Sequence, residues 1–181
     1  MLRCIRLLET PPAASDLAAA RVLTLPYDER VKSRLAAMTA DGTAVAVLLP
    51  RGTVLRDGSV LVAESGEYVV VRASAQPLTR VTANSPLQLL RAVYHLANRH
   101  VHAQLAVDHV LIERDPVLER MLVALGARVE HVELPFDPEA GAYDSHGHAH
   151  GHHHHEEIDD VSATVGEQLS IEAHRTRGQP T

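Results

Sequence analysis

The spacing of apolar residues changes once along this 181-residue chain, close to Gln76-Pro77, and that change limits what the chain can fold into. Before this point, short apolar and β-branched runs are separated by turn-forming dipeptides, a pattern typical of β-strands. After it, apolar residues recur about every fourth position, as in amphipathic helices. We therefore expect an α+β protein with an all-β N-terminal domain over residues 1–75 and a second domain over residues 76–143.

The first 75 residues predict strands joined by tight turns. The expected strands are Val22–Leu25, Ala44–Leu49, Val60–Val62 and Tyr68–Arg72, with the turn dipeptides Asp41-Gly42, Asp57-Gly58 and Ser65-Gly66 between them. The polar segment Asp28–Arg34 has Arg30, Lys32 and Arg34 at every second position. As a strand, this segment would carry three positive charges on one face. A solvated face is the preferred interpretation, and contact with a partner is the alternative.

The second domain predicts the order β-α-β-β-α-β of a ferredoxin-like fold. Its expected strands are Leu78–Thr82, Ala103–Val107, His109–Glu113 and Arg128–Leu134. Ser85, followed by Pro86 and Gln88, forms a capping-box pattern that begins a helix running to about residue 98. Asp115-Pro116 begins a second helix, which Gly126 ends. Two helices would then cover one face of an antiparallel sheet.

Two histidines near the end of the first helix have different predicted surroundings. Leu89, Val93 and Leu96 share an apolar face, and His100 is the next position along it. His95 falls on the opposite, polar face, where a surface role is expected. The remaining histidines of the domain, His102, His109 and His131, are expected to be hydrogen-bonded polar residues on strands.

Near the C-terminal end, seven of ten consecutive residues are histidine: His146, His148, His150, His152, His153, His154 and His155. Neutral imidazole is the commonest protein ligand for borderline divalent metals, so we predict binding of Ni²⁺, Cu²⁺ or Zn²⁺. Interruptions by glycine and alanine, and the residues that follow, favour a native metal-binding segment over an expression tag. Pro135–Tyr143 is expected to be an irregular connector, and residues 144–181 a disordered, acidic, histidine-rich tail.

Charge and composition exclude several functions. Five of the six net negative charges lie from Asp144 onward, and the chain has neither a basic stripe nor a tryptophan, so nucleic-acid binding is not expected. No apolar run approaches the roughly 18 residues that span a bilayer, and no membrane association is expected. With the single cysteine, Cys4, these features predict a cytoplasmic protein. No motif orients a nucleophile or cradles a phosphate, so an enzyme is not expected.

Several segments, in this order along the chain, resemble the urease accessory nickel chaperone family, UreE. They are Leu49–Gly58, Tyr94–Val101, Asp115–Glu119 and Pro135–Tyr143, followed by the histidine-rich end. The resemblance implies a homodimer that delivers Ni²⁺ to urease, built from a β-rich domain, a ferredoxin-like metal-binding domain and a mobile histidine tail. It also implies two partners, the urease accessory GTPase and the urease apoprotein complex.

In that family the histidine that closes the Asn-Arg-His motif, here His100, lies at the dimer two-fold axis and binds metal with its symmetry mate, and tail histidines add ligands. Arg114 and Pro116 stand where some members carry further histidines, so a second metal site on this domain is not expected. The alternative function is storage or buffering of nickel, copper or zinc without a client. Storage needs only the tail, whereas a two-domain body favours delivery.

Overall fold

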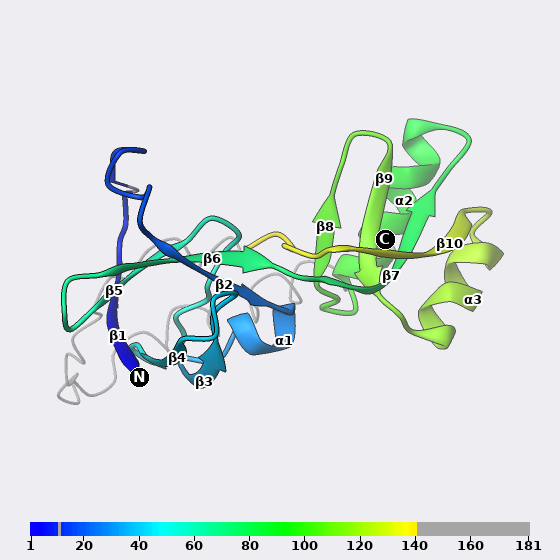
Figure 1. Ribbon diagram of the computed structural model, residues 1–181. Coiled ribbons are helices and arrows are strands. Elements are labelled where there is room, and N and C mark those ends of the chain that lie inside the picture. Colours follow the sequence, from blue (N-terminus) through cyan, green and yellow to red (C-terminus); the bar gives the residue numbers. More distant parts are fainter. Residues whose placement is uncertain (11, 141–181) are drawn as a thin grey trace, which may run out of the picture. The chain divides into compact units, whose positions relative to one another are not determined.

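The computed structural model describes residues 1–10 and 12–140 (Figure 1). The histidine-rich segment His146–His155 and the rest of the predicted tail lie outside the described residues. The described part has the predicted α+β class, with one β-sheet domain followed by a second sheet that carries helices. Within it, no helix is both long enough and apolar enough to cross a membrane.

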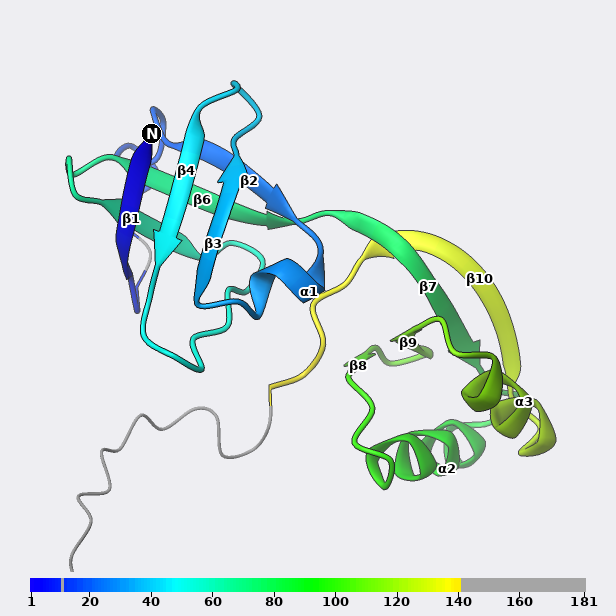
Figure 2. The same cartoon turned by 90° about the horizontal axis from the view of Figure 1, so that it is seen from below.

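The N-terminal sheet contains six strands. They are β1 (Leu2–Leu7), β2 (Arg21–Leu25), β3 (Arg34–Met38), β4 (Ala44–Leu48), β5 (Val60–Ala63) and β6 (Tyr68–Ala73). Their order is β2-β6-β5-β1-β4-β3, in which β1 with β4 and β2 with β6 are parallel pairs. The sheet curls until its edges approach each other (Figure 2), and the Ala40 N–H donates to the Val22 carbonyl at 2.9 Å. The curled sheet is therefore nearly closed around its core.

Two of these strands, β1 and β3, were absent from the prediction. The pairing of β1 with β5 shifts register between Cys4 and Arg6, so the strand does not keep the alternation by which a strand is recognised. Strand β3, Arg34–Met38, contains no β-branched or aromatic residue and two alanines, so its β signal is weak. The predicted turns are confirmed, because Gly42 and Gly58 have φ of 79° and 82°, a left-handed conformation suited to glycine.

The predicted strand over Asp28–Arg34 is wrong. Tyr27–Arg30 forms one helical turn, α1, which follows Pro26 and has Asp28 and Glu29 in its first turn, where acidic groups stabilise a helix. The turn directs Arg30 inward, and its side chain has no exposed surface. Lys32 and Arg34 are exposed. The three cations therefore share no face, and the predicted positive strand surface does not exist.

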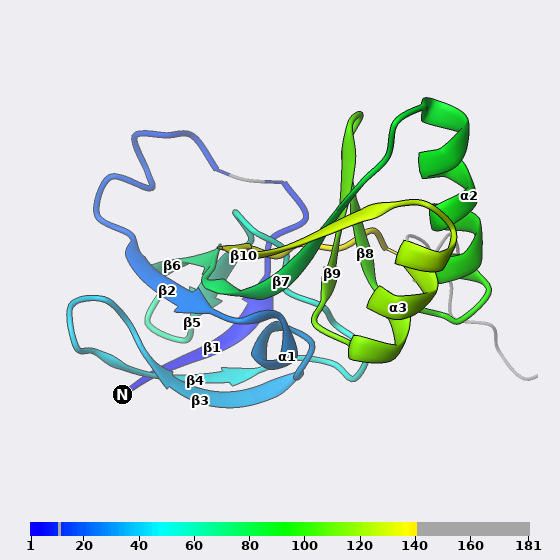
Figure 3. The same cartoon turned by 90° about the vertical axis from the view of Figure 1, so that its right-hand side faces the viewer.

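The second sheet is fully antiparallel, with the order β10-β7-β9-β8. Its strands are β7 (Ala75–Thr82), β8 (Ala103–Leu105), β9 (His109–Glu113) and β10 (Arg128–Pro135). Helices α2 (Pro86–Ala97) and α3 (Pro116–Ala124) cover one face (Figure 3). Val81, Val110 and Ile112 of the sheet pack against Leu96 and Leu122 of the helices. The predicted ferredoxin-like arrangement is therefore confirmed.

Both predicted helix starts are also present. The Ser85 hydroxyl accepts a hydrogen bond from the Gln88 N–H at 3.3 Å, and an Asp115 carboxylate oxygen accepts from the Val117 N–H at 2.7 Å. Such side chains satisfy backbone donors that have no partner within the first helical turn. At the other end of α3, Gly126 has φ of 84° and ends the helix as predicted.

A polar cluster lies between α3 and the sheet. The buried Thr79 hydroxyl donates to Glu119 Oε1 at 2.5 Å, and His131 Nε2 lies 3.0 Å from the same oxygen. The hydrogen bond from Thr79, followed by that from His131, keeps the pKa of the Glu119 carboxyl below its usual value, against the opposing effect of burial. The ionised carboxylate therefore stabilises the attachment of α3 to β7 and β10.

We expect Glu119→Gln to reduce the sensitivity of the fold to acid. A carboxyl whose folded pKa is lowered contributes stability that is present above its unfolded value, near 4.5, and is lost as pH falls through the folded pKa. Urea denaturation at pH 7 and pH 3 should show a smaller loss of unfolding free energy in the variant than in the wild type. Glu130→Gln, on the exposed face of β10, is the matched control and should follow the wild type. Equal losses in all three proteins would contradict this account.

Candidate metal centre

His100 lies in a turn beyond α2 and not on the helix face that the sequence predicts. The helix ends at Ala97. The His100 N–H then donates to the Ala97 carbonyl at 2.9 Å, and the Val101 N–H donates to the Leu96 carbonyl at 3.3 Å. This pair of bonds is a Schellman motif, which closes a helix with one residue in the left-handed conformation. The predicted continuation of the apolar face to His100 is therefore wrong, because the helix stops before that position.

The backbone of His100 is strained. Among residues 1–10 and 12–140, His100 is the only residue other than glycine with a positive φ, at 53°. Glycine usually occupies this place in the motif, since the left-handed conformation costs an L-residue about 1–2 kcal/mol. The imidazole itself is exposed to solvent. An exposed histidine at a position where glycine would be more stable indicates a role in binding and not in packing.

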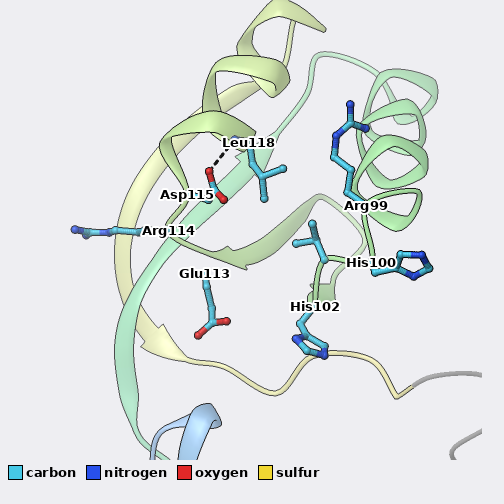
Figure 4. Close-up of a pocket in the computed structure, with 8 residues that line it drawn as sticks. Arg99, His100, His102, Glu113, Arg114, Asp115 and Leu118 are labelled. Atoms are coloured by element: carbon cyan, nitrogen blue, oxygen red, sulfur yellow. Dashed lines mark hydrogen bonds between the residues drawn. The ribbon is translucent and has the colours of Figure 1, made fainter.

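An open cavity of about 340 Å³ adjoins His100 (Figure 4). Its lining includes Arg99, His100 and His102 on one side and Glu113, Arg114 and Leu118 on the other. The His100 ring is directed away from the labelled Glu113 and His102 side chains. Nowhere in the described part of the chain do three histidine, cysteine or acidic side chains converge as metal ligands. His100 would therefore need ligands from outside these residues to hold an ion.

The other histidines of this domain have contacts of their own. The His102 ring meets the edge of Tyr27, with centroids 5.3 Å apart, and His102 precedes β8 instead of lying on it. His109 Nδ1 lies 2.7 Å from Asp108 Oδ1, and His131 contacts Glu119. His95 is half-buried beside Tyr94. The contacts of His109 and His131 fit their expected role as hydrogen-bonded polar residues on strands, whereas His102 lies before its predicted strand against a ring and His95 is less exposed than predicted.

The single cysteine does not supply a ligand at the surface. Cys4 is completely buried in the core of the β-sheet domain. Burial, and then the negative charge of Glu67, raise the pKa of its thiol to about 11. Metals bind the thiolate and not the thiol, so Cys4 is unsuited to ligation near neutral pH.

Helix α2 carries a second apolar stripe that the sequence analysis missed. Leu87, Leu90 and Tyr94 follow each other at helical spacing and are 60%, 64% and 65% exposed. They lie opposite the buried Ala92 and Leu96, and the stripe runs toward the helix end at which His100 lies. Three large apolar side chains on one exposed face mark a surface for protein contact. The spacing of Leu87, Leu90 and Tyr94 was visible in the sequence. The helix was predicted from the buried stripe alone, so the exposed stripe was not considered.

The segment after β10 is irregular, as predicted for the connector over Pro135–Tyr143, and its first residues are packed against the fold. Phe136 has no exposed surface and meets the edge of the Tyr27 ring, with centroids 5.4 Å apart. Asp137 pairs with Arg30 at 2.8 Å. An apolar anchor and a counter-ion for a buried cation thus fix this segment. Residues 136–140 have no regular secondary structure, as predicted, whereas Pro135 belongs to β10 and residues 141–143 lie outside the described part.

These features define a two-domain α+β protein that presents one strained, exposed histidine beside an uncovered apolar helix face. The models for the N-terminal and C-terminal domains of the UreE urease accessory protein match residues 5–74 and 76–160. This chain therefore belongs to the UreE family of urease accessory proteins, as the resemblance in sequence indicated. The family places it in urease maturation as an accessory protein and not as an enzyme.

Relatives that carry the name urease accessory protein UreE cover most of this chain. One from Ralstonia nicotianae is 53% identical over 145 residues, which cover 76% of this chain and 69% of the relative. One from Burkholderia lata is 54% identical over 139 residues, with 75% and 67% covered. One from Cupriavidus necator is 47% identical over 153 residues, with 82% and 80% covered.

We expect His100→Gly to make the metal-free protein more stable. Glycine adopts a positive φ without a steric clash of Cβ, so the free energy of unfolding should rise by about 1 kcal/mol. His100→Ala retains the clash and should not show this gain. Urea denaturation of both variants beside the wild type measures the difference. A glycine variant less stable than the alanine variant would show that the turn is not strained.

Proposed function

We propose that this protein is a homodimeric metallochaperone that binds Ni²⁺ and delivers it to urease during urease maturation. Ni²⁺ is the cargo, held by His100 of both protomers and by tail histidines. The candidate tail ligands are His146, His148, His150, His152, His153, His154 and His155. The observation that carries the proposal is the exposed and strained His100, which has no co-ligands among the described residues.

Self-association through α2 would supply what His100 lacks. A two-fold interface uses the same patch on both protomers, so the stripe of Leu87, Leu90 and Tyr94 would cover its own copy. Burying each such side chain contributes roughly 1.5–3 kcal/mol, which offsets part of the cost of association. His100 lies at the end of the same helix, so a two-fold axis that passes near that end would also bring two His100 side chains toward one ion.

Ligation by imidazole suits a protein that must release its metal. Two His100 side chains would offer two nitrogens in a fixed place, and each tail histidine would join at the high effective concentration of a tethered group. An ion held in this way can lose its ligands one at a time to an acceptor. Nitrogen ligands alone do not select nickel, since copper binds more tightly and zinc nearly as well. We therefore expect Zn²⁺ and Cu²⁺ to bind as well.

The proposal assigns a task to each part of the chain. Residues 1–75 dock a partner, residues 76–143 hold the metal, and residues 144–181 gather ions. The proposed partners are the urease accessory GTPase and the urease apoprotein complex, in the cytoplasm. Arg30 is buried, whereas Lys32 and Arg34 are exposed. These two cations of residues 28–34 could therefore contact a partner.

Isothermal titration calorimetry with Ni²⁺ tests the proposed site in three proteins: the intact chain, a chain ending at Tyr143 and the His100→Ala variant. We expect a chain ending at Tyr143 to bind fewer ions than the intact chain, and His100→Ala to lose the tightest class of site. The affinity of that class should fall at least about tenfold, or about 1.4 kcal/mol. His95→Ala, on the same helix, is the matched control. Tight binding that survives in His100→Ala would contradict the assignment.

A charge placed in the exposed stripe tests the dimer. We expect Leu90→Glu to shift the protein from dimer to monomer in sedimentation velocity, because the charge would have to be buried in the interface. The tight nickel site should be lost in the same variant. Leu105→Glu, on β8 and 46% exposed, is the matched control and should remain dimeric. A monomeric Leu90→Glu protein that keeps the tight site would refute the shared ion.

A further inference from the structure

We infer that Tyr27 of the β-sheet domain is a positioning residue for the metal centre, because its ring supports His102 and so holds the turn that presents His100. Tyr27 acts through His102 and does not itself touch the ion. The inference rests on the proposed function, since it concerns the affinity with which His100 binds Ni²⁺.

Contacts with helix α2 fix one side of the turn at His100. The His100 N–H donates to the Ala97 carbonyl at 2.9 Å, and the Val101 N–H donates to the Leu96 carbonyl at 3.3 Å. Both bonds return to the last turn of the helix. A residue with φ of 53° keeps that conformation only where its surroundings impose it. Contacts on the other side of the turn, toward β8, should therefore contribute as well.

The residues that lead from His100 into β8 are held by neighbours outside the two helices. The His102 ring meets the edge of the Tyr27 ring, with centroids 5.3 Å apart and planes inclined by 66°. This is the edge-to-face arrangement that aromatic pairs favour. The carbonyl of the next residue, Ala103, accepts a hydrogen bond from the Glu139 N–H at 2.9 Å. Two successive residues after the turn are therefore anchored.

Tyr27 is a fixed support for His102. Only 7% of Tyr27 is exposed, and its N–H donates to Gln76 Oε1 at 2.9 Å. Its ring meets the edge of Phe136 with centroids 5.4 Å apart, and the guanidinium carbon of the buried Arg30 lies 5.4 Å from the ring centroid. These neighbours leave the ring little freedom. A side chain that rests on it is therefore held by the β-sheet domain, to which Tyr27 belongs.

The arrangement gives His102 a supporting role and not that of a second ligand. In Figure 4 the rings of His100 and His102 point in different directions. His102 is exposed, so the core does not need its ring for packing. The contact with Tyr27 instead joins the β-sheet domain to a point two residues beyond His100. Its effect therefore falls on the turn.

Loss of this contact should weaken nickel binding by lowering the fraction of chains whose turn is ready to bind. The apparent dissociation constant equals the intrinsic constant divided by that fraction. The free energy of one aromatic edge contact corresponds to a change of about twofold to tenfold in such an equilibrium. We therefore expect weaker binding without loss of the site.

Competition with a chelator measures the dissociation constant of the tightest Ni²⁺ site in the full chain. In His102→Ala we expect this constant to rise about twofold to tenfold. His102→Phe keeps a ring against Tyr27 but has no nitrogen to offer a metal, so it should restore the wild-type value. His109→Ala, which removes a histidine of β9 and its contact with Asp108, is the matched control and should leave the constant unchanged.

Two further measurements keep the outcome decisive. Tyr27→Leu removes the ring but keeps an apolar side chain, so it should weaken binding as much as His102→Ala, and the double variant should bind no more weakly than either single one. In the metal-free protein, the Val101 amide should exchange hydrogen faster in His102→Ala and at the wild-type rate in His102→Phe. If Tyr27→Leu does not fold, the two His102 variants decide, because replacing this exposed residue spares the core.

The results separate this inference from the proposed function. A wild-type dissociation constant in His102→Ala, or in a folded Tyr27→Leu protein, overturns the positioning role and leaves the proposed function intact. Equal weakening in His102→Phe and His102→Ala also overturns it, because the nitrogen and not the ring contact would then matter. A wild-type protein without a tight site that His100→Ala removes contradicts the proposed function, and the positioning role fails with it. Weaker binding and faster exchange in His102→Ala, both restored in His102→Phe, support the positioning role.

Discussion

The buried guanidinium of Arg30 is the interaction on which the described structure most depends. A charge without exposed surface loses its hydration, at a cost of several kcal/mol, and must recover that free energy from partners. Its partners are the carbonyls of Leu55 and Phe136, the carboxylate of Asp137 and the face of the Tyr27 ring, 5.4 Å away. These groups come from both domains, so the cation is stabilised only when the chain after β10 is in place.

Helix α2 connects stability to binding because it has two apolar faces. The inner face, with Ala92 and Leu96, closes the core against the sheet. The outer face carries an apolar stripe that nothing in the described residues covers. At its end stands a histidine in a conformation that glycine would adopt at lower cost. The strained turn at His100 and the exposed apolar stripe both lower the stability of the isolated chain. Such losses of stability are common at functional sites.

The elements that could be predicted are those with local signals. Ser85 and Asp115 are N-cap residues that mark the starts of α2 and α3. Turns that contain glycine separate strands of the first domain. The end of α2 near residue 98 was predicted, but the turn that follows was not, because His100 occupies the position at which glycine usually marks such a turn. The class of the fold was accessible from the sequence, but the turn that presents His100 was not, and the role of His100 as a ligand stays a prediction.

Contacts between residues far apart in sequence account for most of the remaining errors. Arg30 and Asp137 are more than a hundred positions apart, and no local pattern relates them. The burial of Arg30 therefore has no local signal, which is why the predicted exposed strand over Asp28–Arg34 is wrong. The seven tail histidines were identified from composition alone, and their role as ligands stays a prediction because they lie outside the described residues.

The burial of Cys4 has a consequence for how this protein withstands oxidants. An exposed thiol would react with peroxides or form a disulfide with a second copy, and either product would couple the protein's activity to the oxidation state of the cell. The only sulfhydryl of this chain is closed inside a β-sheet core, and its raised pKa keeps it protonated. The proposed loading and unloading of an ion by imidazoles would therefore proceed without interference from the chemistry of this thiol.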